Sequence, residues 1–450
     1  MKKLLAVLIT LAPAVAAAQP PPSPPAPASP GPALTLDEAI AQGLANSQRI
    51  AELQAREEAA QFAAAGRHDA YFPTISLQGG YTRTNHVEEF AVIAPGPSRV
   101  VVYPDIPDNY RSRLDLQWPI YTGGRTDALV QAANAERTAA GKDVAAARAD
   151  LKLEITRAFY AVLTARDTED VLRRSLDAAG AHLRDVRSRL ASGLIPPNDV
   201  SSAEAEVSHQ RVLALEASNL RGVAEADLQR LIGAPPGPVV LAEPAPVENP
   251  LFGRVADNAT VADLIARALE ARPERQALEL RAASADSRAS ATSSTKWPQV
   301  GFGSGFDYAN PQPRNFPRAS VWATAWDVSI NATWTLWDGG RRGAETGEAR
   351  ANAKALRTRV GDFDRQVTFE VRQRALELES SRQAVSAAAD EVRAAVEAER
   401  VVGERYNAGV ATATDVLDAQ VARLQAELDR TRAVANVRLA EARLERAIGQ

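Results

Sequence analysis

The chain has 450 residues, no cysteine, and 52 Lys plus Arg against 56 Asp plus Glu, which gives a formal net charge of -4. The absence of cysteine excludes disulfides, thiolate metal sites, a cysteine nucleophile and the N-terminal cysteine of a lipoprotein. A charge so close to balance gives no indication of a nucleic-acid partner.

The first 18 residues have the pattern of a secretory signal peptide. Lys2 and Lys3 precede an apolar run that ends in small residues at Ala18. This run is shorter than the ~18 to 20 apolar residues of a membrane-spanning helix, so export is favoured over an anchor. Residues 19–34 are rich in proline and predict an extended tether.

The remainder of the chain reads as two copies of one unit. Thr35 and Thr260 each open a capping-box pattern, and they lie 225 positions apart (260 − 35). Further markers keep a spacing of 216 positions, among them Trp118 and Trp334 (334 − 118). Ordered markers at fixed spacings predict an internal duplication. The predicted limits are a first repeat at 35–234, a Pro-rich inter-repeat linker at 235–259 and a second repeat at 260–450.

Each unit continues from a first helix into strands. The helix predicted at 35–72 ends before Pro73, and apolar residues then alternate with polar ones, which is the period of a half-buried strand. Leu114 and Leu116, for example, alternate with Asp115. The predicted strands are 74–84, 112–121, 299–308 and 327–336, which form two hairpins with connecting loops at 85–110 and 309–325.

Alternation alone leaves a soluble sandwich and a membrane barrel as two interpretations. A sandwich needs a second sheet, which a mostly helical chain does not offer. Strands of ~9 to 11 residues match the thickness of an outer-membrane barrel, and aromatic residues such as Tyr81 and Trp118 lie at the strand ends. Four strands cannot close a barrel, so several chains would each contribute a sector.

Two proline-free stretches, Arg125–Leu190 and Arg341–Tyr406, predict helices ~100 Å long at 1.5 Å per residue. Leu172, Ala179 and Val186 belong to a heptad seam of the first stretch. Shorter helices, among them 35–72 and 198–232, would pack end to end along each long one. The predicted fold class is mainly α with a small β part, a coiled-coil wall joined to a transmembrane sheet sector.

The two turns that follow the long helices carry the most specific motifs. The first runs from Arg189-Leu190-Ala191-Ser192-Gly193 to Asp199-Val200, and the second from Arg405-Tyr406-Asn407-Ala408-Gly409 to Asp415-Val416-Leu417-Asp418. With the duplicated helix and hairpin pattern, they resemble the TolC family of outer-membrane factors over essentially the whole mature chain. The resemblance implies a homotrimer in outer-membrane lipid with a twelve-stranded barrel and a long periplasmic helical extension. It further implies a periplasmic adaptor and an inner-membrane pump as partners, no catalysis and no cofactor.

The turn residues have a physical reading beside this resemblance. Gly193 and Gly409 fit the left-handed position at which a helix ends, and Arg189 and Arg405 complement a helix C-terminus. The resemblance makes these four residues, together with Leu190, the surface that contacts the adaptor.

The acidic residues of the tips have two possible roles. Asp415 and Asp418 are three apart, and in a trimer they would place six carboxylates around a narrowing axis. The alternative is that Asp415 caps its helix with Thr412. The resemblance makes both aspartates, together with Asp199 and Tyr406, the entrance gate. Ala411 stands where a family member has an arginine, so that part of the lock is missing or replaced.

No feature of the sequence indicates an enzyme. The four histidines are isolated, and His182 and His209 are predicted on solvated helix faces. The predicted function is therefore a passive duct that exports small molecules or ions. Type I protein secretion is an alternative for the same kind of component, and a non-transporting periplasmic coiled-coil scaffold is an alternative of another class.

Overall fold

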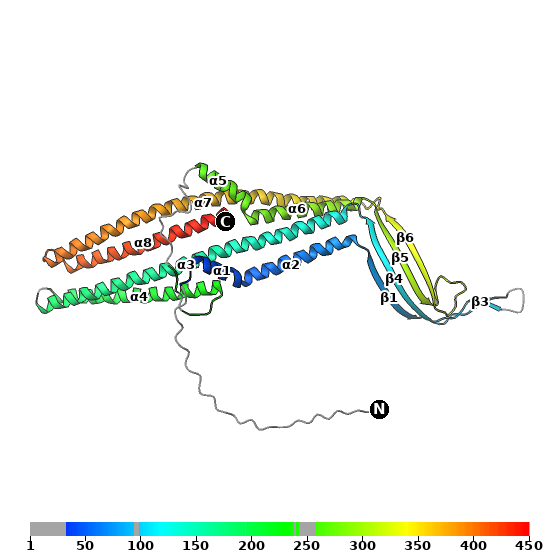
Figure 1. Ribbon diagram of the computed structural model, residues 1–450, viewed down its shortest axis with the longest axis horizontal. Coiled ribbons are helices and arrows are strands. Elements are labelled where there is room, and N and C mark those ends of the chain that lie inside the picture. Colours follow the sequence, from blue (N-terminus) through cyan, green and yellow to red (C-terminus); the bar gives the residue numbers. More distant parts are fainter. Residues whose placement is uncertain (1–32, 94–98, 194, 238–239, 243–257, 450) are drawn as a thin grey trace, which may run out of the picture.

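The computed structural model describes residues 33–93, 99–193, 195–237, 240–242 and 258–449. The signal peptide, nearly all of the tether and most of the inter-repeat linker therefore lie outside the described residues. Figure 1 shows a long body of helices with a sheet at one end and two helical turns at the other. The helices are α1 Leu36–Asn46, α2 Gln48–His68, α3 Arg125–Ala191, α4 Pro197–Ile232, α5 Asn258–Ala271, α6 Pro273–Ser293, α7 Arg341–Asn407 and α8 Ala413–Ala447, with short 3-10 turns η1 Asp69–Tyr71 and η2 Ser294–Lys296.

The two long helices confirm the sequence prediction almost to the residue. Each has 67 residues and no internal proline, and each begins after a glycine with positive φ, Gly124 or Gly340. On α3, the heptad residues Leu172, Ala179 and Val186 are buried, while Arg173 and Asp177 between them are exposed. The seam therefore packs this helix against its neighbours in the body.

The helix predicted at 35–72 is wrong as a single element. At Ser47 the backbone is extended, and the Ser47 hydroxyl accepts a hydrogen bond from the Ile50 amide at 3.3 Å, so the chain ends α1 and caps α2. The second half breaks at the equivalent place, because Pro273 disfavours a helical conformation at Arg272.

One of the two predicted capping boxes is confirmed. Thr35 accepts from the Glu38 amide at 3.3 Å, and the Glu38 carboxylate accepts from the Thr35 amide at 2.9 Å. Thr260 is not a cap, because α5 already begins at Asn258 and Thr260 lies inside it.

The main sheet is antiparallel, with the strand order β1-β4-β5-β6. Both predicted hairpins are present, and the pairing of β4 with β5 joins the two halves of the chain. The loop predicted at 85–110 is wrong in part, because its β-branched residues form a second, two-stranded sheet. The strands are β1 Thr74–Arg83, β2 Phe90–Ile93, β3 Arg99–Tyr103, β4 Asp108–Tyr121, β5 Gln299–Asn310 and β6 Ala323–Thr333.

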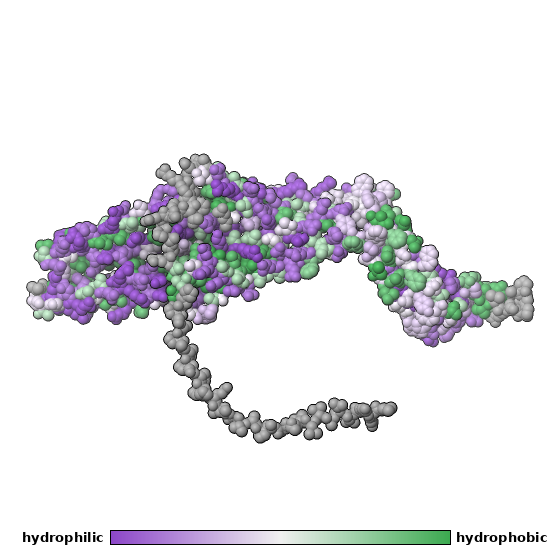
Figure 2. Space-filling model, in the orientation of Figure 1, coloured by the Kyte–Doolittle hydropathy of each residue, from purple (hydrophilic) through white to green (hydrophobic). Residues whose placement is uncertain are grey.

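The main sheet has two different faces. Its apolar face carries large exposed side chains on every strand: Ile75, Leu77, Tyr81, Tyr110, Leu114, Trp118, Phe306, Tyr308, Trp326, Val328 and Ile330. Figure 2 shows hydrophobic residues gathered over the sheet, whereas the helical body is mostly hydrophilic. Its polar face carries Arg111, Arg113, Asp115, Gln117, Asp307, Asp327, Ser329 and Asn331.

Each half of the helical body has its own hydrophobic core. In the first half Ile155 and Phe159 of α3 pack with Leu228 of α4, and in the second half Val371 of α7 packs with Leu444 of α8. Polar contacts connect the halves where α3 runs beside α6 and α8. The body is therefore a row of packed helices with buried apolar seams.

Candidate functional site

The two turns lie together at the end of the body opposite the sheet (Figure 1). The first tip is the turn between α3 and α4, and the second tip is the turn between α7 and α8. Gly193 and Gly409 have φ values of 75° and 77°, a region that favours glycine. At the second tip, the Gly409 amide donates to the Tyr406 carbonyl at 3.0 Å and the Val410 amide to the Arg405 carbonyl at 2.9 Å. This pair of bonds is a Schellman motif, so both glycines are helix-ending residues.

Arg189 connects the two tips. Its guanidinium donates to the Asn407 side chain at 2.8 Å and to Asp185, on its own helix, at 2.9 Å. Its Cζ atom also lies 4.3 Å from the ring centroid of Tyr406. Leu190, the next residue, is half-buried, whereas Arg405 is exposed. The sequence did not predict this contact between the tips, because its partners are 218 positions apart.

Tyr406 lies in a buried environment beneath Arg189. The residue is only 7% exposed, its ring centroid is 5.9 Å from that of His182, and its hydroxyl has no hydrogen-bond partner among the described residues. Burial raises the pKa of Tyr406, which Arg189 opposes. The prediction of His182 on a solvated face is wrong, because burial lowers the pKa of His182. In the part of the chain that the structure describes, its buried Nε2 atom has no partner either.

Asp415 is part of a complete capping box. The Asp415 carboxylate accepts from the Thr412 amide at 2.8 Å, and the Thr412 hydroxyl accepts from the Asp415 amide at 3.2 Å. The hydrogen bonds that the Thr412 amide and hydroxyl donate to this carboxylate lower the pKa of Asp415. Asp418 lies one turn further along α8 and is exposed. The capping box by itself explains why an aspartate stands at position 415. Both Asp415 and Asp418 are exposed to solvent.

Asp199 occupies the corresponding place in the first tip, at the third position of α4. Its carboxylate accepts from the Asn198 side chain at 3.2 Å. The residue at the helix cap is Pro196, which makes no side-chain cap bond. Asp199 makes no hydrogen bond to the Tyr406 hydroxyl within the chain, so Arg189, rather than Asp199, holds Tyr406 there.

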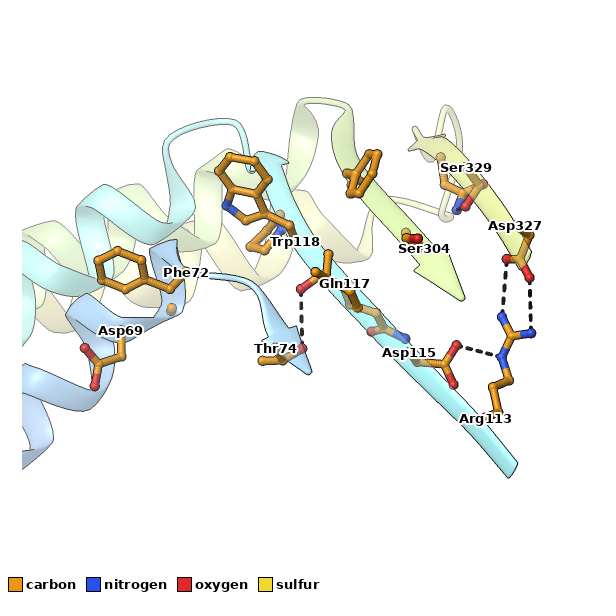
Figure 3. Close-up of a pocket in the computed structure, with 17 residues that line it drawn as sticks. Asp69, Phe72, Thr74, Arg113, Asp115, Gln117, Trp118, Ser304, Asp327 and Ser329 are labelled. Carbon is orange, nitrogen blue, oxygen red and sulfur yellow. Dashed lines mark hydrogen bonds and ion pairs between the residues drawn. The ribbon is translucent and has the colours of Figure 1, made fainter. Parts of the chain in front are cut away.

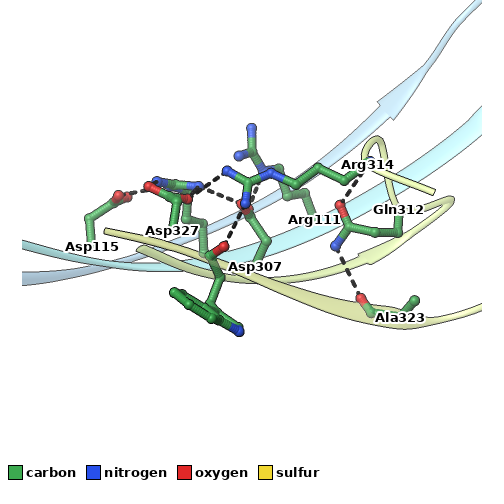
Figure 4. A network of polar contacts seen from close by, with 9 residues as sticks. Arg111, Asp115, Asp307, Gln312, Arg314, Ala323 and Asp327 are labelled. Atoms are coloured by element: carbon green, nitrogen blue, oxygen red, sulfur yellow. Dashed lines mark hydrogen bonds and ion pairs between the residues drawn. The ribbon is translucent and has the colours of Figure 1, made fainter. Parts of the chain in front are cut away.

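A second polar cluster lies on the polar face of the sheet. Arg113 donates to Asp115 at 2.7 Å and to Asp327 at 3.1 Å, and it also binds Asp307. Arg314, from the connection between β5 and β6, donates to Asp327 at 2.8 Å (Figure 4). The cluster therefore joins three strands and a loop through charge-assisted hydrogen bonds.

The glycine run of β5 makes this cluster possible. A Cβ atom on Gly305 would collide with the guanidinium of Arg113, so the missing side chain lets Arg113 cross β5 to reach Asp327. Beside the cluster is an open hollow of about 690 Å³ that extends to Asp69 at the end of the helical body. Figure 3 shows Arg113, Asp115 and Asp327 along one side of it. The polar face is thus a charged surface beside an open hollow, in contrast to the apolar face.

The described residues contain no helix that is both long and apolar enough to cross a membrane. In the same part of the chain, no group of three or more His, Asp or Glu side chains has a geometry that would hold a metal ion.

An apolar face on one side of a sheet sector and a polar face on the other are the features of a strand segment between lipid and a water-filled lumen. With the long helical body, they define an outer-membrane channel of the helical-duct class.

The profile of one family, described as outer membrane efflux protein, matches residues 39–234 and 264–450. The chain therefore belongs to the outer membrane efflux protein family. Among curated proteins, it is 26% identical to protein CyaE of Bordetella pertussis over 358 residues, which cover 76% of this chain and 68% of CyaE. It is 27% identical to the cobalt-zinc-cadmium resistance protein CzcC of Cupriavidus metallidurans over 28% of this chain and 31% of CzcC.

Among solved structures, the fold is similar to that of the outer membrane protein VceC of Vibrio cholerae. The TM-score is 0.76 at 19% identity, and the match covers 92% of this chain and 96% of VceC. The family and the fold together confirm the predicted family resemblance, fold class and outer-membrane location. The chain is an outer-membrane efflux channel protein, with its sheet in the membrane and its helical body extending into the periplasm.

Proposed function

We propose that three copies of this chain form the passive outer-membrane duct of a tripartite exporter, with a periplasmic adaptor and an inner-membrane pump as partners. The observation that carries the proposal is the open sheet sector, whose four strands have an apolar face for lipid and a charged face for a lumen. Three such sectors supply twelve strands, enough to close a barrel and remove its exposed edges.

The two tips form the entrance in this proposal. Three copies bring the Asp415 and Asp418 carboxylates around one axis, where like charges attract cations and repel one another. Asp199 and Tyr406 line the same end and complete the gate. The adaptor binds the outside of the tips at Arg189, Leu190, Gly193, Arg405 and Gly409.

Small molecules or ions are the proposed cargo. The name of CzcC, cobalt-zinc-cadmium resistance protein, supports ions among them, although the match covers less than a third of either chain. Type I protein secretion is the second candidate and uses the same duct. The two differ in the width that the open entrance must reach, because a polypeptide needs a wider pore than an ion.

A planar-bilayer recording tests the entrance. We expect a small, cation-selective conductance from the detergent-purified protein, and several-fold weaker cation preference in the double variant Asp415→Asn/Asp418→Asn. Asparagine keeps an oxygen that accepts a hydrogen bond from the Thr412 amide, so the cap remains while the charge is lost. The matched control, Asp362→Asn/Asp429→Asn, removes two charges far from the tips and leaves selectivity unchanged.

Three results would contradict parts of this proposal. An unchanged selectivity in the tip variant reduces both aspartates to structural roles. A folded wild type that never conducts refutes the duct. Isolation as a stable monomer refutes the trimer and leaves only a scaffold role.

A further inference from the structure

The main sheet ends in two open edges. Every residue of β1 is exposed, and β6 carries large exposed apolar side chains such as Ile330. Just beyond the end of β6, Trp334 and Trp337 are 58% and 85% exposed. Long apolar edge strands pair with another chain unless something covers them. The edges therefore need a partner, and the internal repeat indicates how a second copy would fit.

The repeat already reproduces one strand register within the chain. β1 maps onto β5 by adding 225 to each residue number, and β4 maps onto β6 by adding 216. Thr74 lies opposite Gln117 in the pair β1–β4. The two shifts convert this pair into Gln299 opposite Thr333, which is the pairing found between β5 and β6. The register of one hairpin thus predicts that of the other without adjustment.

Hydrogen bonds at the helix–strand junctions obey the same rule. The indole nitrogen of Trp118 donates to the Tyr71 carbonyl at 2.8 Å, and that of Trp334 donates to the Lys296 carbonyl at 3.0 Å. Trp334 is the counterpart of Trp118, and Lys296 is that of Tyr71. The correspondence therefore holds for individual side chains as well as for strands.

We propose that β6 of one subunit pairs with β1 of the next in the register of the β4–β5 pair, with Trp334 opposite Leu77 of the next subunit. Within the chain, Trp118 lies opposite Phe302. Trp334 follows Trp118 by 216 positions, and Leu77 precedes Phe302 by 225. The inference rests on the proposed trimer and adds the register by which it closes.

The proposed register passes an independent check. It puts Ile330 opposite Tyr81 on the apolar face and Asn331 opposite Gly80 on the polar face. A slip of one residue would turn one strand's apolar side chains toward the lumen. It also continues the pairing of β6 past Thr333 to Trp334, so the strand in the trimer is longer than in the single chain.

Charged residues of the helical body show the same correspondence between contacts within the chain and contacts between subunits. Arg174 of α3 and Glu427 of α8 lie 3.7 Å apart and link the two helical hairpins of one chain. Adding 216 to Arg174 gives Asp390 on α7, and subtracting 216 from Glu427 gives Arg211 on α4. The signs are reversed, but the pair is still complementary. Asp390 of one subunit therefore faces Arg211 of the next.

Exposed apolar residues mark the same interface. Leu376 of α7 and Val223 of α4 are 69% and 59% exposed. Their counterparts are Tyr160 of α3 and Leu439 of α8, which together line a groove within the chain. The surface that is covered between the two halves is thus repeated on the outer sides of the chain, where a second copy would cover it.

Disulfide trapping in the full chain tests the register, because the sequence has no cysteine to interfere. The pair Gln78→Cys/Thr333→Cys lies directly opposite in the proposed register, where Cβ atoms are about 4.5 to 5.5 Å apart, against about 7 to 8 Å for a diagonal neighbour. We expect a covalent trimer on non-reducing gels after mild oxidation of outer membranes. The off-register controls combine Thr333→Cys with Ser76→Cys or Gly80→Cys and give at least fivefold less product.

A second pair, Gly79→Cys/Ala332→Cys, lies on the apolar face and tests the same register if the first variant fails to fold. We expect it to give the same covalent trimer. If an off-register pair links best, the trimer stands and the register is wrong. If no pair links the subunits and the wild type is monomeric, the proposed trimer itself is wrong.

Discussion

The two halves of the chain have long helices of equal length but differ in the chemistry of their tips. At the second tip, Thr412 and Asp415 form a reciprocal cap, and Tyr406 is buried. The first tip has Pro196 where the second has Thr412, so Asp199, the counterpart of Asp415, has no cap partner. One scaffold thus holds a turn with a reciprocal cap beside a turn whose carboxylate bonds the neighbouring Asn198 side chain instead.

The largest effect is expected from the contact that joins the tips. Arg189→Ala removes the hydrogen bond to Asn407 and the cation above the aromatic ring of Tyr406. The lost attraction of about 2 kcal/mol should raise the population of separated tips roughly 30-fold. Spin labels at Ser188→Cys and Glu404→Cys report the separation. The counterpart variant Arg405→Ala makes no such contact in the chain and leaves the distance distribution unchanged. If the two variants changed the distance distribution equally, Arg189 would have no special role in joining the tips.

Acid is expected to weaken the same contact through His182. Burial lowers the pKa of His182 and Arg189 lowers it further, while Asp185 opposes both. A histidine with a lowered folded pKa stabilises the tips above its ordinary pKa of 6.5, and this contribution is lost as the pH falls through the lowered value. The labelled tips therefore separate more at pH 5 than at pH 7.5. His182→Phe abolishes this response, and an unchanged response would assign it to another group.

A smaller effect is expected from the cap of the second tip. The hydrogen bonds to Thr412 lower the pKa of Asp415, so its contribution is complete above the usual aspartate pKa of 3.8 and is lost as the pH falls through the lowered value. Thr412→Ala removes the bond from the hydroxyl, so thermal unfolding should show this variant less stable than the wild type at pH 7, with the difference narrowing as the pH falls toward 3. Pro196→Ala, which removes no cap bond, keeps the wild-type profile. A shift in both would show that the tips do not differ in this respect.

The smallest effect concerns the ion pair between subunits. Surface pairs contribute roughly 0.2–1 kcal/mol, so Asp390→Arg should lower the melting temperature of the detergent-solubilised trimer only slightly. Adding Arg211→Asp restores the attraction with exchanged signs and should recover most of the loss. If the double variant does not recover the melting temperature even at low salt, Asp390 and Arg211 do not face each other. The interface between subunits would then differ from the contact between the two halves of one chain.

Local patterns in the sequence predicted the elements well. The bounds of the long helices, both hairpins and the two faces of the sheet follow from periodicity and from the positions of glycine and proline. The break at Arg272 was also visible, since Pro273 is a common first residue of a helix. The strand pair β2–β3 was hidden by the expectation of a single long loop.

Contacts between distant parts of the chain could not be predicted in this way. Arg189 reaches Asn407 only because two helices of equal length bring their ends together, and no local pattern records that length match. Arg113 reaches Asp327 because Gly305 lacks a side chain, a relation that spans three strands. Gly305 lies within the strand predicted at 299–308, but the reason for a glycine there becomes clear only from the assembled sheet.

The equal length of α3 and α7 has an evolutionary consequence. Two rods of 67 residues that start at one sheet and meet at one pair of tips cannot change length separately. A one-turn insertion in either rod would move its tip by about 5.4 Å and detach it from the other. Length changes during descent should therefore come in matched pairs, at equivalent positions of both repeats. Where the distance between the outer and inner membranes differs among bacteria, we would then expect members of this family to carry insertions of equal length in both long helices.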